Sequence, residues 1–297
     1  MITVSGLTKQ YRDRTAVDDL TFTLAAGRVT GFVGPNGAGK STTMRMMVGL
    51  TRSDAGEVRY DGVGYTHLRH PTHMVGAVLD ARCMHAGRTA RNHLRAMAAM
   101  SSIPQDRVEE VLAIVGLESV ASKRAGGFSL GMRQRLALAG ALLGDPQVLL
   151  LDEPSNGLDP DGIRWLRNHL TDFAKRGGTV FVSSHLIAEL AMFADDLVVV
   201  GGGKLLAAET VESITTRSAV TVVVETPQPA DLARVLADDV TVEVMGDRLA
   251  LRGTTKAAVS ELAFNHGIRL VELVETTASL EDTLLDLTGA SAEFASA

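Results

Sequence analysis

The sequence predicts an α/β fold around a largely parallel sheet, followed by a small α+β domain. Short apolar runs recur in the first two thirds of the chain, and most of them lack the polar alternation of a half-exposed strand. Such runs are typical of parallel strands that are buried on both faces, and they fall at residues 29–33, 75–79, 148–151, 179–183 and 196–200. Helical patterns separate them, and this alternation favours a parallel sheet covered by helices.

The helical patterns also indicate an insertion. Core helices are expected at 41–48, 129–143 and 163–175. The segment 81–143 is mostly helical, with helices expected at 89–100 and 105–115, so we interpret it as a helical subdomain inserted into the α/β core. A hairpin is expected at 198–209, around three consecutive glycines.

The character of the chain changes after about residue 218. Strand and helix patterns follow in the order β-α-β-β-α-β, which matches a split βαβ, ferredoxin-like unit, and an amphipathic helix is expected at 279–289. No phosphate loop or ligand cluster is visible in this part. We therefore place the two domains at 1–217 and 218–297.

Composition narrows the class of protein. With 297 residues and 45% apolar side chains, the chain can bury a substantial core. Its net charge of −6 argues against nucleic-acid binding, and the single cysteine, Cys83, indicates a reducing compartment. No secretory signal is visible at the N-terminus, and no run of about 18 apolar residues could span a bilayer. A membrane role would therefore require a separate chain.

A glycine-rich loop follows the strand expected at 29–33 and opens the helix expected at 41–48. Its pattern G-x-x-x-x-G-K-S surrounds phosphate oxygens with backbone N–H groups at a helix N-terminus. Lys40 can reach the β- and γ-phosphates, and the Ser41 hydroxyl can bind Mg²⁺. A plain glycine-rich turn is the alternative, which the complete spacing and flanks disfavour. The predicted nucleotide-binding residues here are Gly34, Pro35, Asn36, Gly37, Ala38, Gly39, Lys40, Ser41 and Thr42.

Two carboxylates end the strand expected at 148–151, in the stretch VLLLDEP. Ligands of such sheets bind at the carboxyl ends of the strands. Asp152 is placed to hold Mg²⁺, directly or through water, and Glu153 to polarise the attacking water. Solvated acids at a strand end are the alternative, which the phosphate loop disfavours.

With these motifs in this order, the chain resembles the ATP-binding subunits of ATP-binding-cassette (ABC) transporters over about residues 1–215. The resemblance implies an ATPase fold with ATP and Mg²⁺ as cofactors. It places Tyr11 against the adenine ring and includes Val17 among the nucleotide-binding residues. It also implies that Asp159 lies at a dimer contact and that His185 contacts the γ-phosphate.

The stretch Phe128–Met132 resembles the family signature Leu-Ser-Gly-Gly-Gln. Ser129 and Gly131 are retained, and a hydroxyl with free N–H groups at a helix N-terminus is an anion site. In the family this turn faces the nucleotide of a second cassette, so the working unit would be a homodimer or a heterodimer. Leu130 and Met132 replace a glycine and a glutamine, a variant that resembles bacitracin- and daunorubicin-type exporters.

Asp80 stands where the family normally has a glutamine, at the end of the strand expected at 75–79. A carboxylate near other carboxylates and phosphates is costly unless a cation lies between them. Asp80 therefore either binds Mg²⁺ or serves coupling to the membrane partner, and we favour coupling.

The histidines and arginines of the helical region can be interpreted in two ways. His67, His70 and His73 could be metal ligands, but Pro71 interrupts the helical spacing. A positively charged coupling surface toward a membrane partner is the favoured reading.

We expect an ATPase that binds an integral membrane permease at the cytoplasmic face of the membrane and drives export of a drug or antibiotic. A soluble ABC-type ATPase without a membrane partner is the alternative. A P-loop GTPase or kinase is disfavoured, because no Asn-Lys-x-Asp motif is present. The C-terminal domain either regulates or stabilises the dimer, or has a simple packing role.

Overall fold

The computed structural model describes residues 1–12, 14–80, 84–185, 187–217, 220–236 and 240–277. These residues form two compact units, 1–211 and 212–277, which are described separately. The division falls at the start of α8 (Val211–Arg217), whereas the sequence placed it at the end of that segment. The helix expected at 279–289 lies outside the described residues.

A six-stranded sheet forms the centre of the first unit, in the order β10-β9-β3-β8-β7-β6. Its strands are β3 (Val29–Val33), β6 (Val75–Val78), β7 (Val148–Leu151), β8 (Thr179–Ser184), β9 (Asp196–Gly201) and β10 (Lys204–Thr210). Neighbouring strands are parallel except β9 and β10, which form the expected hairpin. The predicted α/β fold is thus confirmed.

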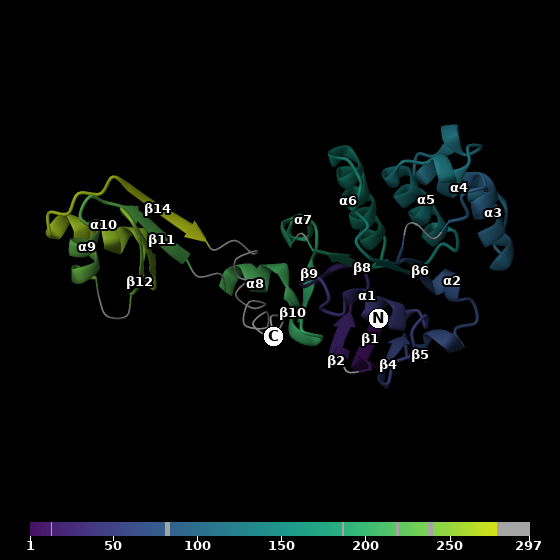
Figure 1. Cartoon of the computed structure of the whole chain (residues 1–297), viewed down its shortest axis with the longest axis horizontal. Coiled ribbons are helices and arrows are strands. Elements are labelled where there is room, and N and C mark those ends of the chain that lie inside the picture. The colour runs from purple at the N-terminus through teal and green to yellow at the C-terminus, as the bar shows by residue number, and fades with distance from the viewer. Residues whose placement is uncertain (13, 81–83, 186, 218–219, 237–239, 278–297) are drawn as a thin grey trace. The chain divides into compact units, whose positions relative to one another are not determined.

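A second, antiparallel sheet was not predicted from the sequence. It contains β1 (Ile2–Tyr11), β2 (Arg14–Leu24), β4 (Ala55–Tyr60) and β5 (Val63–Gly64), in the order β2-β1-β4-β5. Together with α1 (Lys40–Met47) it covers one face of the six-stranded sheet, as Figure 1 shows. The core between the sheets includes Phe32 and Phe181, whose stacked rings have centroids 4.8 Å apart.

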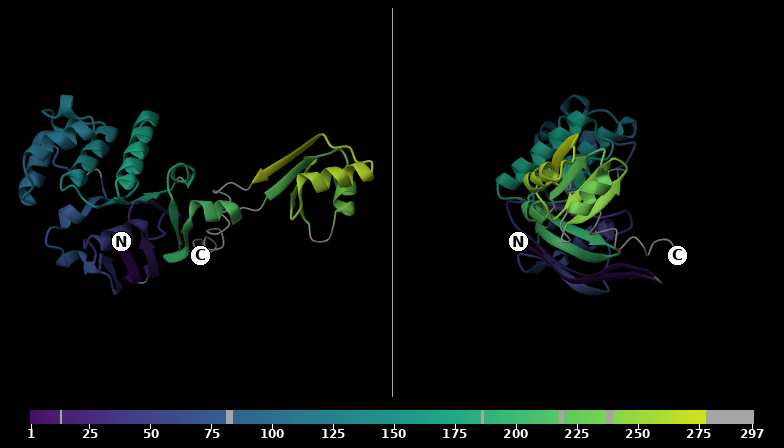
Figure 2. Two further views of the ribbon diagram at one scale, coloured as in Figure 1. Left: turned by 180° about the vertical axis from the view of Figure 1, so that it is seen from behind. Right: turned by 90° about the vertical axis from the view of Figure 1, so that its left-hand side faces the viewer.

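The other face of the central sheet is covered by α6 (Pro160–Lys175) and by the inserted helices, which Figure 1 and Figure 2 show side by side. The inserted helices are α3 (Ala90–Met100), α4 (Asp106–Ile114) and α5 (Leu130–Leu142), which confirms the expected helical subdomain. Shorter helices are α2 (Pro71–Met74) and α7 (Ile187–Ala191), with 3-10 turns at Tyr65–His67, Glu118–Val120 and Ala125–Gly127. Within the described part of the chain, every helix is too short or too polar to cross a bilayer.

The second unit contains a four-stranded antiparallel sheet in the order β12-β13-β11-β14. Its elements are β11 (Val220–Glu225), α9 (Pro229–Val235), β12 (Thr241–Met245), β13 (Arg248–Arg252), α10 (Lys256–Asn265) and β14 (Glu272–Thr277). The strand β13 lies between β11 and β12, which confirms the expected split βαβ arrangement. Val222, Val224, Leu249 and Leu251 form its core with Val259 of α10.

Candidate active site

The register of the parallel strands brings the predicted site segments to one edge of the sheet. Val33 at the end of β3 is paired with Ser184 of β8, and Leu151 at the end of β7 is paired with Val182 of β8 and Val78 of β6. The phosphate loop, His185, the two carboxylates and Asp80 each follow one of these four strand ends. Segments far apart in the sequence therefore meet where ligands of α/β sheets bind.

The phosphate loop is held in a shape that only glycine permits at two positions. A Cβ added at Gly34 would overlap the carbonyl oxygen of Val200, and one added at Gly39 would overlap that of Ala16. Gly39 also has a φ of 100°, a conformation that L side chains rarely adopt. The loop is thus closely packed against β9 and β2 and leads directly into α1.

Lys40 is a buried cation at the centre of the site, with 6% of its surface exposed. Its ammonium group donates hydrogen bonds to the carbonyl oxygens of Gly34 (2.6 Å) and Pro35 (3.2 Å). Burial lowers the pKa of Lys40, while the negative charges of Glu153 and Asp152 raise it and only partly offset this effect. A buried ammonium beside a glycine cradle fits the phosphates of a nucleotide.

Asp152 is oriented by Ser183, a fully buried residue of β8. The Ser183 hydroxyl donates a hydrogen bond to Oδ1 of Asp152 at 2.6 Å and accepts one from the N–H of Glu153 at 2.9 Å. No group of three or more His, Cys, Asp or Glu side chains in the described residues could hold a metal ion. The residues fit Mg²⁺ nevertheless, because this ion is usually bound through one or two protein oxygens together with water and phosphate. Ser41 and Asp152 are suited to that role.

Glu153 has a positive φ of 50°, which is uncommon for a residue other than glycine. Its Oε2 lies 2.7 Å from Nδ1 of His185, within hydrogen-bond distance. The structure therefore brings together the two residues that were predicted to be catalytic. His185 is placed to hold the Glu153 carboxylate in one direction, as general-base catalysis requires.

Tyr11 ends β1 and is paired with Arg14 of β2. Tyr11 is 48% exposed, and Nζ of Lys9 lies 5.4 Å from the centroid of its ring. Arg14 donates a hydrogen bond to the carbonyl oxygen of Gly37 at 3.1 Å, so this end of the β1–β2 hairpin adjoins the phosphate loop. Val17 is fully buried, and a Cβ added at Gly39 would lie 3.2 Å from its side chain, so Val17 packs against the phosphate loop.

The signature-like turn lies at the start of α5. Ser129 is the N-cap, and its hydroxyl accepts a hydrogen bond from the N–H of Met132 at 3.2 Å. Gly131 approaches Gly157, because a Cβ at Gly131 would lie 3.3 Å from the Gly157 carbonyl oxygen. No hydrogen bond of the described residues joins Ser129 to the phosphate loop of its own chain. Asp159, the predicted dimer contact, is the N-cap of α6 and accepts from the N–H of Gly162.

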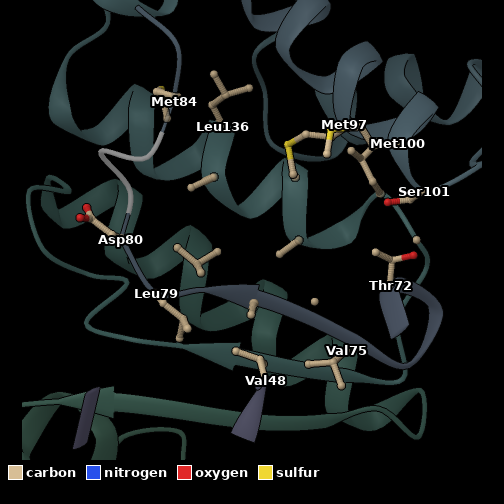
Figure 3. A pocket seen from close by; sticks show the side chains of 18 of the residues that line it. Val48, Thr72, Val75, Leu79, Asp80, Met84, Met97, Met100, Ser101 and Leu136 are labelled. Atoms are coloured by element: carbon tan, nitrogen blue, oxygen red, sulfur yellow. The ribbon is translucent and has the colours of Figure 1, made fainter. Parts of the chain in front are cut away.

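Asp80 lies at one end of a cleft of about 690 Å³ between the central sheet and the helical subdomain. Figure 3 shows Val48, Val75 and Leu79 on one side of this cleft and Met97 and Leu136 on the other. Arg45, Arg88 and His93 add basic groups to the mostly apolar lining. The three histidines His67, His70 and His73 do not line a metal site in the described residues.

Sequence reasoning missed Ser183 and Arg14. In the sequence, Ser183 belongs to a buried strand. Its place at the carboxyl end of that strand, where ligands bind, was the only sign of a role in the site. Arg14 lies three residues after Tyr11, and a basic residue in the same hairpin as a nucleotide-stacking aromatic could have drawn attention to it.

Comparison with known proteins agrees with this geometry. A family model described as ABC transporter matches residues 17–156. A Bacillus subtilis relative described as an uncharacterized ABC transporter ATP-binding protein, YhcH, is 38% identical over 99% of this chain and 97% of its own length. The chain belongs to the ATP-binding proteins of ABC transporters. The family resemblance is thereby confirmed, and as a member of this family the chain binds ATP and hydrolyses it.

Further relatives of this ABC ATPase are named as transport or export proteins. The bacitracin transport ATP-binding protein BcrA of Bacillus licheniformis is 39% identical over 69% of this chain and 68% of its own length. The Nod factor export ATP-binding protein I of a Rhizobium strain is 34% identical over 98% of each chain. A solved structure of an ATP-binding subunit of an ABC transporter is 26% identical, with a TM-score of 0.67 over 73% of this chain and 92% of its own. The C-terminal residues 220–281 match a domain of unknown function.

Proposed function

We propose that two cassettes of this kind bind Mg-ATP between them in a head-to-tail arrangement and that hydrolysis drives export through a separate membrane subunit. A drug or antibiotic is the proposed cargo. The name of the Nod factor export relative supports this direction of transport, and the name of the bacitracin transport relative supports such a cargo.

The observation that carries the proposal is the exposed turn at Ser129. Its hydroxyl and the first N–H groups of α5 form an anion site that no described hydrogen bond joins to the phosphate loop of the same chain. A phosphate from a second cassette would complete that site. A dimer with two shared nucleotide sites follows from this.

At each site the side chains have separate roles. The phosphate loop and Lys40 bind the phosphates, and Ser41 with Asp152 would hold Mg²⁺, which supplies charge neutralisation when bound. Tyr11 would stack on the adenine ring. Glu153 accepts a proton from the attacking water, and His185 keeps the Glu153 carboxylate oriented.

The cleft beside Asp80 is the proposed contact for the membrane subunit. Its apolar lining and its basic residues Arg45 and Arg88 suit a partner segment with apolar and acidic side chains. Asp80 follows β6 and lines this cleft, so we assign it to coupling. The cassette would then act as a peripheral protein on the cytoplasmic face of the membrane.

The variant Glu153→Gln tests the dimer. It should bind Mg-ATP, hydrolyse it very slowly and elute as a dimer in size-exclusion chromatography. Adding Lys40→Met to this variant should return it to a monomer, because ATP no longer binds. If Glu153→Gln remains monomeric in saturating Mg-ATP, the isolated chain does not form the proposed dimer.

A soluble ATPase without a membrane partner is the competing function, and the net charge of −6 already disfavours ribosomes or DNA as its target. Co-purification from detergent-solubilised membranes separates the two functions. Recovery of an integral membrane protein supports the transporter, and recovery of the cassette without one supports the soluble ATPase.

A further inference from the structure

The backbone of Glu153 is fixed by side chains from two different elements. Its φ of 50° is unfavourable for a glutamate, so the surrounding structure must hold it. The N–H of Glu153 donates to the hydroxyl of Ser183 at 2.9 Å. Its carbonyl oxygen accepts a hydrogen bond from Nε2 of Gln134 at 3.4 Å. Both backbone polar groups of Glu153 therefore have a side-chain partner.

Gln134 lies in the second turn of α5 and is 7% exposed. It lines a small cavity together with Val78 of β6, Leu138 of α5 and Leu151 of β7. Burying an amide in such surroundings costs free energy unless it forms hydrogen bonds. An aliphatic residue would suit this position if packing were its only role, so the contact with Glu153 accounts for the glutamine.

The first turn of α5 is also fixed against the loop that follows Glu153. Leu130 packs on Gly157, because a Cβ at Gly157 would overlap the Leu130 side chain. The backbone of Gly131 approaches the carbonyl oxygen of the same glycine. The helix thus contacts this loop at Gly157 and at Glu153. These two contacts fix the position of the Gln134 amide relative to the Glu153 carbonyl oxygen.

We infer that Gln134 is a positioning residue for Glu153, which rests on the proposed role of Glu153 as the base that activates water. Among the described residues, no hydrogen bond joins the Gln134 side chain to the phosphate loop. Gln134 holds the strained peptide of Glu153 so that the carboxylate points toward His185 and the site of the γ-phosphate. Loss of its donor lets that peptide relax and moves the carboxylate away from the water.

The first experiment uses Gln134→Met in the full chain, which keeps the volume and removes the donor. The rate constant kcat should fall about 10- to 100-fold, because a small misplacement of a catalytic group has that effect. Equilibrium binding of a fluorescent ATP analogue should stay within about twofold of wild type, because Gln134 does not bind nucleotide. Gln147→Met is the matched control, since Gln147 is exposed at the opposite end of β7. An unchanged kcat, or an equal loss of nucleotide affinity, overturns the inference.

A second variant tests the donor itself. Gln134→Glu keeps the shape of the side chain, but its ionised carboxyl group cannot donate. Burial raises the pKa of such a group, and its protonated form regains a donor. The ratio of the variant's kcat to that of wild type should therefore rise as pH falls from about 8 to about 6. A ratio that does not change with pH contradicts the role of the donor.

The third experiment separates this inference from the proposed function. In the background of Glu153→Gln, addition of Gln134→Met should change the slow residual hydrolysis by less than about twofold, because its effect acts through Glu153. A fall as large as in wild type shows that Gln134 acts elsewhere and overturns the inference. If Glu153→Gln alone retains wild-type activity, the assignment of Glu153 fails instead.

Discussion

The hydroxyl of Ser183 donates a hydrogen bond to Oδ1 of Asp152 at 2.6 Å while it accepts one from the N–H of Glu153 at 2.9 Å. One buried hydroxyl thus orients the proposed magnesium ligand and the backbone of the proposed base. Parallel pairing of β7 and β8 makes this possible, because it aligns Leu151 with Val182 and so places the next residues side by side.

Ser183→Ala should therefore affect both carboxylates. We expect a loss of about 1–3 kcal/mol in the free energy of unfolding, since a buried acceptor and a buried donor lose their partner. The Mg²⁺ concentration required for half-maximal ATPase activity should rise as well. Denaturant unfolding and magnesium titrations measure these effects.

Thr30→Val is the matched control on the neighbouring strand β3. The Thr30 hydroxyl is buried and has no hydrogen-bond partner, so its removal should leave stability unchanged or raise it by about 1 kcal/mol. If Ser183→Ala is as well tolerated as Thr30→Val, the double hydrogen bond does not matter for the site.

Lys40→Met should separate nucleotide binding from the stability of the empty protein. Burial lowers the pKa of Lys40, so the folded state disfavours its charge relative to water, and an apolar side chain removes that cost. The unfolding temperature without nucleotide should be equal to or higher than that of wild type. The increase in the free energy of unfolding that ATP produces in wild type, about 2.7 kcal/mol at 100 times the Kd, should disappear. A thermal shift that persists at saturating ATP contradicts the proposed role of Lys40.

We expect His169 on α6 to make the stability of the fold sensitive to acid. Its ring stacks on Trp165 with centroids 5.7 Å apart, and its Nε2 is buried without a hydrogen-bond partner. Burial and the nearby charge of Arg176 lower its pKa, and Asp172 opposes this only in part. Since the folded pKa lies below the unfolded value of about 6.5, the unfolded chain takes up the proton first and stability falls as pH drops below that value.

His169→Phe should remove this contribution while keeping an aromatic ring on Trp165. The free energy of unfolding should decrease less between about pH 7.5 and about pH 5.5 than in wild type, by at most about 1.4 kcal/mol per pH unit. His93, whose pKa burial also lowers, retains its own part of the acid sensitivity. Identical pH dependence in the variant and wild type contradicts this account.

Much of the fold follows from local signals in the sequence. The strands at 29–33, 148–151 and 179–184 are largely apolar in sequence, and every residue in them is buried. The phosphate loop is equally local, since its glycines, lysine and serine lie within eight consecutive residues. Such features can be predicted because short-range spacing determines them.

The contacts that orient the site are not local. Gln134 is 19 residues from Glu153, and Ser183 is 31 residues from Asp152. Their partners depend on the register between neighbouring strands and on the docking of α5, which no short pattern records. The antiparallel sheet with Tyr11 was missed for a related reason, because its strands pair with segments as distant as β4.

Asp80→Ala tests one of the positions at which the sequence differs from the expected family pattern. If Asp80 serves coupling at the cleft, Mg-ATP binding and the basal ATPase should stay within about twofold of wild type, while stimulation by the membrane partner falls about 5- to 150-fold. Asp80→Gln, which restores the usual family residue, should retain most of that stimulation. Asp145→Asn is a suitable control, because asparagine tolerates the positive φ of 48° at this position and the ion pair that exposed Asp145 forms with Arg107 should contribute little. Loss of magnesium-dependent nucleotide binding in Asp80→Ala would instead assign Asp80 to the metal, since removing a ligand weakens binding before any partner is engaged.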